Sequence, residues 1–230
     1  MNDSQGGPAL PFHDRREAGR ALAKNLREYA GRSDVVVLSL PRGGVPVAFE
    51  IAKALQAPLD VFVVRKLGVP GQEELAMGAI ASGGIRDINE DVVRRLRIPA
   101  RIIEAVAQKE EHELRRRESE YRDGRAAQDV RGKIVILVDD GLATGASMRA
   151  AALALKKKEP SRTIVAVPVA PRETCADFES IVDEVICAIT PEPFRAVGEW
   201  YEDFSQTTDD EVRTLLKQSA EFSARETTSS

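Results

Sequence analysis

Two adjacent aspartates, Asp139 and Asp140, stand between a run of apolar residues and a run of small ones. The apolar run KIVILVD at 133–139 is typical of a buried strand, and GLATGAS at 141–147 is typical of a turn that leads into a helix. Backbone N–H groups at a helix start carry partial positive charge and bind phosphate, and small residues let the phosphate approach closely. Two carboxylates beside such a site would repel a polyphosphate alone. We therefore expect them to accept hydrogen bonds from sugar hydroxyls or to help hold Mg²⁺.

Simpler interpretations of this segment explain less of it. A strand-to-helix turn with one capping aspartate accounts for one acid and one glycine, but not for two acids followed by the run Thr144 to Ser147. A nucleotide-binding glycine loop needs a Gly-Lys-Ser/Thr triplet, and none follows here. A dinucleotide-binding fingerprint needs a glycine spacing that this loop lacks. The segment therefore favours a site for a sugar phosphate.

The string VILVDDGLATGAS at 135–147 resembles the signature with which type I phosphoribosyltransferases bind phosphoribosyl pyrophosphate (PRPP). The resemblance implies that Asp139 and Asp140 bind the ribose 2′ and 3′ hydroxyls and contribute to catalysis. It implies that they contact Mg²⁺ only indirectly, through PRPP and water. It also implies that the 5′-phosphate is wrapped by Ala143, Thr144, Gly145, Ala146 and Ser147. The order of elements matches the family from about residue 34 to 190.

A second loop follows the first expected strand, DVVVLSL at 34–40. In the family this loop holds pyrophosphate through backbone amides, often with a cis peptide. Arg42, Gly43 and Gly44 are therefore the implied pyrophosphate-binding residues, with a cis peptide expected near Arg42. A Gly-Gly pair alone more often marks an ordinary turn before a helix, and the presence of the first motif reverses that preference.

Basic and acidic residues follow the next expected strand, LDVFVVR at 59–65. The resemblance implies that Lys66 contacts pyrophosphate, and a solvated strand end is an equally good interpretation. The segment GVPGQEE at 68–74 is expected to be a loop, in the place of the family's mobile catalytic loop. Glu73 or Glu74 is then a candidate base or loop anchor, although most exposed glutamates have no such role.

The acceptor side of the site is less defined. Trp200 and Tyr201 are candidates to stack on a flat acceptor, but packing of a C-terminal flap against the sheet is the favoured interpretation of both. Hypoxanthine–guanine enzymes of the family carry a catalytic aspartate three residues after the second acid, where this chain has Ala143. That difference argues against 6-oxopurine chemistry and is closer to the adenine and uracil branches, without identifying the acceptor.

These residues require a scaffold whose strands end at one edge. Val-, Ile- and Ala-rich runs alternate with helical patterns, which predicts an α/β fold with a central parallel sheet flanked by helices. In such sheets ligands bind at the carboxyl ends of the strands. Beyond the runs already named, strands are expected at 163–170 and 183–189, with a further one within ELAMGAIA at 74–81.

The chain is expected to form one domain, at 12–221, with a helical insertion at about 88–125 and a C-terminal hood or flap at about 190–221. The ends, 1–11 and 222–230, are expected to be disordered. The insertion alternates in charge sign and offers (i, i+4) pairs. A solvated arm is the favoured interpretation of it, over a partner surface or a lid.

Composition limits the partners. The formal net charge is −4 and acids interleave with the 33 basic residues, so we expect neither nucleic acid nor a membrane surface as a partner. No apolar run has membrane-spanning length, and the N-terminus has no secretory pattern. Cys175 and Cys187 stand apart, with Cys187 expected as a core thiol, which fits a reducing cytoplasm. Members of the resembled family are often dimers, which leaves a homodimer open.

The resemblance implies a phosphoribosyltransferase that uses Mg²⁺-bound PRPP. Such an enzyme transfers the phosphoribosyl group to a nitrogenous base or related nucleophile and releases pyrophosphate. A non-catalytic regulator that senses PRPP or a nucleotide on the same fold is the alternative. A PRPP-synthase-type protein is a third interpretation, but it requires an ATP site for which the sequence contains no motif.

Overall fold

The computed structural model describes residues 11–227, with side chains through Phe222. Within that range, five strands form a parallel sheet in the order β2 (Leu59–Val61), β1 (Val35–Ser39), β6 (Ile134–Val138), β7 (Arg162–Val169) and β8 (Glu184–Ile189). This confirms the predicted α/β fold with a central parallel sheet. The predicted disordered segment 1–11 lies, apart from Pro11, outside the described residues.

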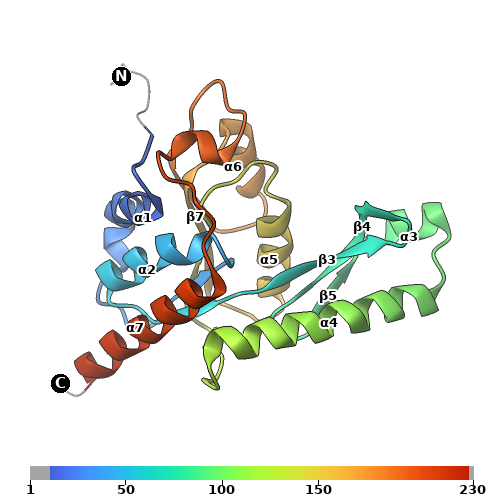
Figure 1. The fold of residues 1–230 in the computed structure, drawn as a ribbon, viewed down its shortest axis with the longest axis horizontal. Helices are drawn as coiled ribbons and strands as arrows, with labels where there is room; N and C mark the ends of the chain where they lie inside the picture. The colour runs from blue at the N-terminus through green and yellow to red at the C-terminus, as the bar shows by residue number, and fades with distance from the viewer. Residues whose placement is uncertain (1–10, 228–230) are drawn as a thin grey trace.

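Helices cover both faces of the sheet (Figure 1). Val35 and Val37 of β1 share one apolar cluster with α1 (Arg15–Ala23), the 3₁₀ turn η1 (Lys24–Tyr29) and α2 (Gly44–Leu55). Val36 and Leu38 share the other cluster with α5 (Ala146–Lys156) and α6 (Arg172–Phe178). Because side chains alternate along a strand, burial on both faces requires the continuous apolar runs seen in the sequence.

An arm projects from this body and carries a second sheet (Figure 1). The second sheet is antiparallel, in the order β3 (Val64–Val69), β4 (Gln72–Ala81) and β5 (Ile85–Ile88). The single strand predicted at 59–65 is therefore wrong, since β2 ends at Val61 and β3 begins at Val64. Ser82, after β4, bonds both backbone groups of Val63: its hydroxyl accepts from Val63 N at 2.7 Å, and its N–H donates to Val63 O at 2.9 Å. These bonds fix the segment between β2 and β3, where the chain passes from the parallel sheet to the antiparallel one.

The loop predicted at 68–74 is also wrong, because the chain forms a hairpin there. Only Pro70 and Gly71 turn between β3 and β4, and Gly71 has φ of 80°, a value that favours glycine. Gly68, taken as a loop former, stays paired with Ala76 at a shift in strand register. The strand expected at 74–81 is confirmed and begins two residues earlier.

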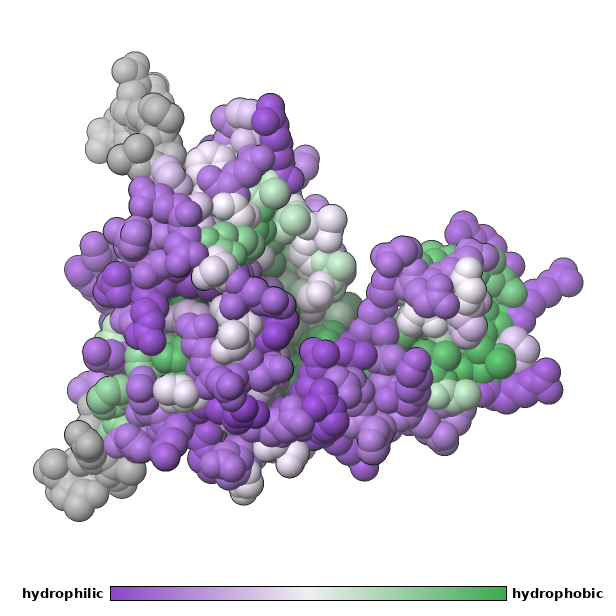
Figure 2. Space-filling model, viewed as in Figure 1, coloured by the Kyte–Doolittle hydropathy of each residue, from purple (hydrophilic) through white to green (hydrophobic). Residues whose placement is uncertain are grey.

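Two helices complete the arm. The predicted cap Asn89 accepts the N–H of Val92 at 3.1 Å and opens α3 (Glu90–Leu96), and Pro99 precedes α4 (Ala100–Arg122). The expected pairs between Glu111 and Arg115 and between Glu113 and Arg117 are formed. The arm is not wholly solvated, since α4 buries Ala107, Leu114 and Tyr121. Figure 2 shows apolar side chains gathered over the arm, whereas polar ones dominate the visible face of the body.

The C-terminal part divides into a short flap and a helix. The flap contains η2 (Val197–Trp200), and α7 (Asp209–Thr227) follows with the predicted cap, Thr208 Oγ1 accepting the N–H of Glu211 at 3.1 Å. The helix continues through residues 222–227, which were expected to be disordered, and residues 228–230 lie outside the described range.

Cys175 and Cys187 form a disulfide, which corrects the prediction of a core thiol at Cys187. The packing of α6 against β8 brings the two residues together although 12 positions separate them in sequence. Sequence spacing alone did not reveal this proximity. Over residues 11–227, the structure contains no helix that is long and apolar enough to cross a membrane.

Candidate functional site

The two aspartates lie at the carboxyl end of β6. All five residues of β6 are buried, whereas Asp139 and Asp140, which follow it, keep part of their surface accessible. Asp140 N donates to Asp139 Oδ1 at 2.9 Å. Arg15 Nε donates to Asp140 Oδ2 at 2.8 Å, and the Asp140 side chain is 16% exposed. The pair therefore forms an acidic group at the edge of the sheet where such folds bind ligands.

The Arg42–Gly44 loop, which follows β1, lies directly against this pair. A Cβ added to Gly43 would fall 2.1 Å from Asp140 Oδ2, and one added to Gly44 would fall 2.9 Å from the Asp139 Cα. A Cβ at Gly44 would collide with the backbone, and one at Gly43 would force the Asp140 carboxylate to turn away, which explains the Gly-Gly pair. The peptide bond between Pro41 and Arg42 is cis, as expected.

The loop after the aspartates is open at its surface and supported from beneath. Ala143, Thr144, Ala146 and Ser147 are exposed, and Gly145, at φ of 68°, precedes α5. No side chain caps α5, so its first backbone N–H groups are available to an anion. Beneath the loop, α6 supplies Thr174, whose hydroxyl donates to Ala143 O at 3.0 Å, and Phe178, which would lie 2.7 Å from a Cβ at Gly145.

Burial shapes the protonation of the acidic pair. Burial raises the pKa of Asp139 well above its ordinary value, and the neighbouring charge of Asp140 raises it further. Burial also raises the pKa of Asp140, although the hydrogen bond and positive charge of Arg15 act in the opposite direction. Two partly desolvated carboxylates side by side are costly, so hydroxyl donors or a cation would stabilise them.

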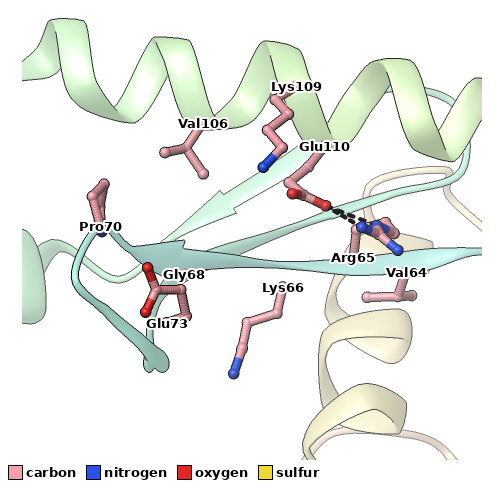
Figure 3. A pocket seen from close by; sticks show the side chains of 9 residues that line it. All are labelled: Val64, Arg65, Lys66, Gly68, Pro70, Glu73, Val106, Lys109 and Glu110. Atoms are coloured by element: carbon pink, nitrogen blue, oxygen red, sulfur yellow. Dashed lines mark hydrogen bonds and ion pairs between the residues drawn. The ribbon is translucent and has the colours of Figure 1, made fainter.

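Lys66 reaches the same region from the arm. It lines a cavity of about 470 Å³ between the arm sheet and α5, together with Thr144, Ala146 and Ser147. Its ammonium lies 3.4 Å from Glu74 Oε2. Figure 3 shows Lys66 on the side of β3 away from α4, whereas Arg65 is bonded to Glu110 of α4. Lys66 therefore lines the same cavity as the loop at 144–147, and it also lines the cavity beside Glu73.

Glu73 and Glu74 lie on the hairpin of the arm. Glu73 lines a second cavity of about 470 Å³, between the hairpin and α4, and not the cavity that Thr144 and Ser147 line (Figure 3). Backbone N–H groups of Glu73 and Gly71 lower the pKa of Glu73. The Glu74 side chain is fully exposed. The structure does not bring either glutamate to the acidic pair.

The aromatic candidates pack into the flap, as the favoured interpretation expected. Tyr201 is 5% exposed, its hydroxyl donates to Asp140 O at 2.6 Å, and its ring stacks on Phe204 at 5.1 Å between centroids. Trp200 packs in the small apolar cluster that contains Val197. Val197 in turn covers Gly141, where an added Cβ would fall 2.5 Å from Val197 Cγ1. Tyr201 therefore supports the aspartate loop from below rather than offering a face to an acceptor.

Sequence reasoning missed Arg15, Thr174 and Phe178. Arg15 is the first residue of α1 and lies 125 positions from Asp140, and no local pattern links the two. Thr174 and Phe178 occupy what the sequence presents as ordinary positions of a short helix. Their contacts with the loop depend on how the elements pack, which the sequence does not reveal directly.

Comparison with known proteins agrees with this geometry. Residues 12–203 match the family model of the phosphoribosyl transferase domain. Proteins of two Mycobacterium tuberculosis strains, CDC 1551 and H37Rv, are 51% identical over 205 residues, and their own naming as phosphoribosyl transferases is provisional. The match covers 89% of this chain and 46% of each relative, so the chain spans about half the length of these relatives.

A solved structure gives the same result for the fold. The crystal structure of a Thermus thermophilus protein superposes with a TM-score of 0.80 at 41% identity, covering 91% of this chain and 99% of that one. The family model spans most of the chain, including both loops and the acidic pair. The chain therefore belongs to the phosphoribosyl transferase family.

Proposed function

We propose that the chain binds Mg²⁺-bound PRPP and transfers its phosphoribosyl group to a nitrogenous base or related nucleophile. One observation carries the proposal: the acidic pair, the Gly43–Gly44 loop and the exposed 143–147 loop meet at the carboxyl edge of one sheet. Family membership supports a phosphoribosyltransferase-like function. The acceptor, and any contribution from the remaining length of the relatives, lie beyond this proposal.

Each loop has a distinct part in the proposed reaction. The first N–H groups of α5, with the hydroxyls of Thr144 and Ser147, bind the 5′-phosphate. Asp139 and Asp140 accept hydrogen bonds from the ribose 2′ and 3′ hydroxyls and fix the sugar. The backbone of Arg42 to Gly44 and the ammonium of Lys66 bind pyrophosphate and stabilise the charge that it gains on leaving. The bond from C1 to pyrophosphate breaks, and the bond from C1 to the nucleophile forms.

Mg²⁺ fits the donors at this edge. Carboxylate oxygens are preferred ligands of Mg²⁺, and a cation would offset the burial and the repulsion by Asp140 that together raise the pKa of Asp139. In residues 11–227, no group of three or more His, Cys, Asp or Glu side chains is arranged to hold a metal ion. We therefore propose that Asp139 and Asp140 contact the ion through PRPP and water. Bound there, Mg²⁺ would neutralise charge on the departing pyrophosphate.

Calorimetry of the Asp140→Asn variant tests the ribose contact. The change keeps the size of the side chain but removes its negative charge and replaces one of its two acceptor oxygens with a donor. We expect PRPP affinity, measured with Mg²⁺ present, to fall by about 10- to 100-fold, since a hydrogen bond to a charged group is lost. The thermal transition should be retained. Unchanged affinity would disprove the ribose assignment.

Pyrophosphate exchange separates an enzyme from a sensor. Labelled pyrophosphate is incubated with PRPP, Mg²⁺ and the protein, with each member of a panel of bases in turn. An enzyme is expected to exchange label into PRPP with at least one base. A protein that binds PRPP but exchanges label with none would be a sensor on the same fold.

A further inference from the structure

Arg15 joins three parts of the molecule at the acidic pair. Its Nε donates to Asp140 Oδ2 at 2.8 Å, and its Nη1 donates to Ser205 O at 2.7 Å. Its guanidinium also lies 4.0 Å from the centroid of the Phe204 ring. The Arg15 side chain is 11% exposed. A guanidinium fixed by a carboxylate, a carbonyl and a ring has little freedom to move.

The fold also fixes the residue from its own helix. The Asp14 carboxylate accepts the N–H of Glu17 at 2.7 Å and caps α1, so Arg15 lies in the first turn of an ordered helix. The backbone of Phe12 pairs with the flap on the other side, through Phe12 N to Trp200 O at 2.9 Å. Arg15 therefore reaches Asp140 from a rigid support.

The hydrogen bonds leave one oxygen available on each carboxylate. Oδ2 of Asp140 is taken by Arg15, and Oδ1 of Asp139 is taken by Asp140 N. Apart from the interaction of the two carboxyl groups with each other, no donor among the described residues bonds to the remaining Oδ1 of Asp140 or Oδ2 of Asp139. A vicinal diol such as the ribose 2′,3′ pair carries two hydroxyl donors, which matches two available acceptors.

Arg15 is also the counter-charge of the pair. No other Lys or Arg in the described part of the chain forms an ion pair with Asp139 or Asp140. Removing the one cation that contacts a mostly buried carboxylate leaves a poorly solvated negative charge, which favours a different rotamer or a bound proton. Either change would spoil the acceptor pattern that a diol needs.

We propose that Arg15 is a positioning residue that orients Asp140 so that one oxygen of each aspartate faces the ribose hydroxyls. It acts through Asp140 and does not touch PRPP. Its bond to Ser205 O ties this orientation to the segment that follows the flap helix η2. This inference rests on the proposed function and adds the residue that prepares its ribose site.

Four variants test the proposal by calorimetry with PRPP and Mg²⁺. Arg15→Met and Arg15→Gln remove the charge, and both are expected to weaken binding by about 10- to 100-fold. Arg15→Lys keeps the positive charge and a nitrogen that can donate to Asp140, and should recover most of that loss. Arg20→Met is the matched control, because Arg20 lies on the same helix with its side chain 57% exposed and reaches only Glu50. It should bind like the unaltered protein.

The rescue by lysine distinguishes positioning from support of the fold, because a purely structural role would make Lys and Gln equally poor. If Arg15→Met does not fold, the PRPP affinities of Arg15→Lys and Arg15→Gln still test whether the positive charge positions Asp140. If Arg15→Gln binds PRPP as tightly as the unaltered protein, or more tightly, the inference about Arg15 is overturned while the proposed function stands. Tighter binding would mean that Arg15 blocks the site. If the unaltered protein and the Arg20→Met control both fail to bind PRPP, the proposed function fails and the inference falls with it.

Discussion

At the scale of single residues, the site is defined by where side chains are excluded. Gly43 and Gly44 pack so closely on Asp140 and Asp139 that a Cβ would displace the Asp140 carboxylate or collide with the Asp139 backbone. Glycine is therefore required here by proximity, since neither residue has the positive φ that usually demands it. The same contact holds the Arg42–Gly44 loop and the acidic pair in one unit.

The Gly43→Ala variant should separate this contact from the fold. Its methyl group would meet Asp140 Oδ2, so the carboxylate must turn away and lose its bond to Arg15. We expect PRPP affinity to fall at least about tenfold, with a stability loss of about 1–3 kcal/mol from overpacking. Calorimetry and thermal melts measure the two effects. Gly31→Asn is the control, because a Cβ there meets nothing within 4 Å and Asn tolerates its φ of 70°. Full affinity in Gly43→Ala would contradict the close contact.

The residues that we propose to bind PRPP were named from the sequence, whereas the residues that support them were missed. Asp139, Asp140 and the loop to Ser147 form one uninterrupted pattern, and the resemblance that it carries also pointed to Arg42 to Gly44 and to Lys66. Arg15 contacts the pair across 125 positions, and Phe178 supports Gly145 from another helix. Contacts of that kind depend on packing geometry, which a single sequence does not encode in any short spacing.

At the scale of elements, α6 supports the 143–147 loop, which we propose to bind the 5′-phosphate, and a disulfide ties α6 to β8. Thr174 and Phe178 contact Ala143 and Gly145 from either side of Cys175, which forms the disulfide to β8. A helix as short as α6 has little stability alone. The disulfide therefore helps to hold the surface on which the loop rests.

Reduction of the disulfide should loosen the loop. Cross-linking residues at this separation stabilises a fold by about 3 kcal/mol, equivalent to roughly 6–12 °C in Tm for a chain of this size. We expect a dithiol reductant to lower Tm by roughly 6–12 °C and to speed hydrogen exchange of the backbone amides of residues 143–149. The double variant Cys175→Ser with Cys187→Ser should behave like the reduced protein and ignore the reductant. Equal Tm and exchange before and after verified reduction would contradict this coupling.

Element prediction succeeded where one physical rule dominated. Continuous apolar runs identified β1, β6, β7 and β8. The residues of β1 and β6 are all buried, those of β7 are buried after the first, and those of β8 are partly buried. The hairpin of β3 and β4 was missed because its glycines and proline favour loops, whereas strand pairing kept Gly68 in the sheet. The apolar run at 59–65 concealed the point at which the chain changes sheets.

At the scale of the whole molecule, a buried ion pair and a hydrogen bond anchor the arm to the body. Arg122 of α4 donates to Asp60 Oδ1 at 2.9 Å, and Tyr121 donates to Asp209 of α7 at 2.6 Å. Burial, followed by the bond to Asp209, raises the pKa of Tyr121 to about 12. Asp209 also lies 4.0 Å from Arg42. The base of the arm is therefore connected to the loop proposed to bind pyrophosphate.

The whole arrangement predicts where a ligand must lie. The body supplies the acidic pair and both backbone loops, and the arm supplies Lys66 across the cavity that Thr144 and Ser147 line. A ligand that carries a 5′-phosphate, a diol and a pyrophosphate has one orientation that satisfies all of these groups at once.

A crystal structure with PRPP and Mg²⁺ tests the central claim most directly. We predict the 5′-phosphate against the N–H groups of residues 144–147 and the ribose hydroxyls on the available oxygens of Asp139 and Asp140. Pyrophosphate should lie along Arg42 to Gly44. Density for PRPP elsewhere, or an empty loop at saturating PRPP with the carboxylates still bonded only to protein, would contradict the account.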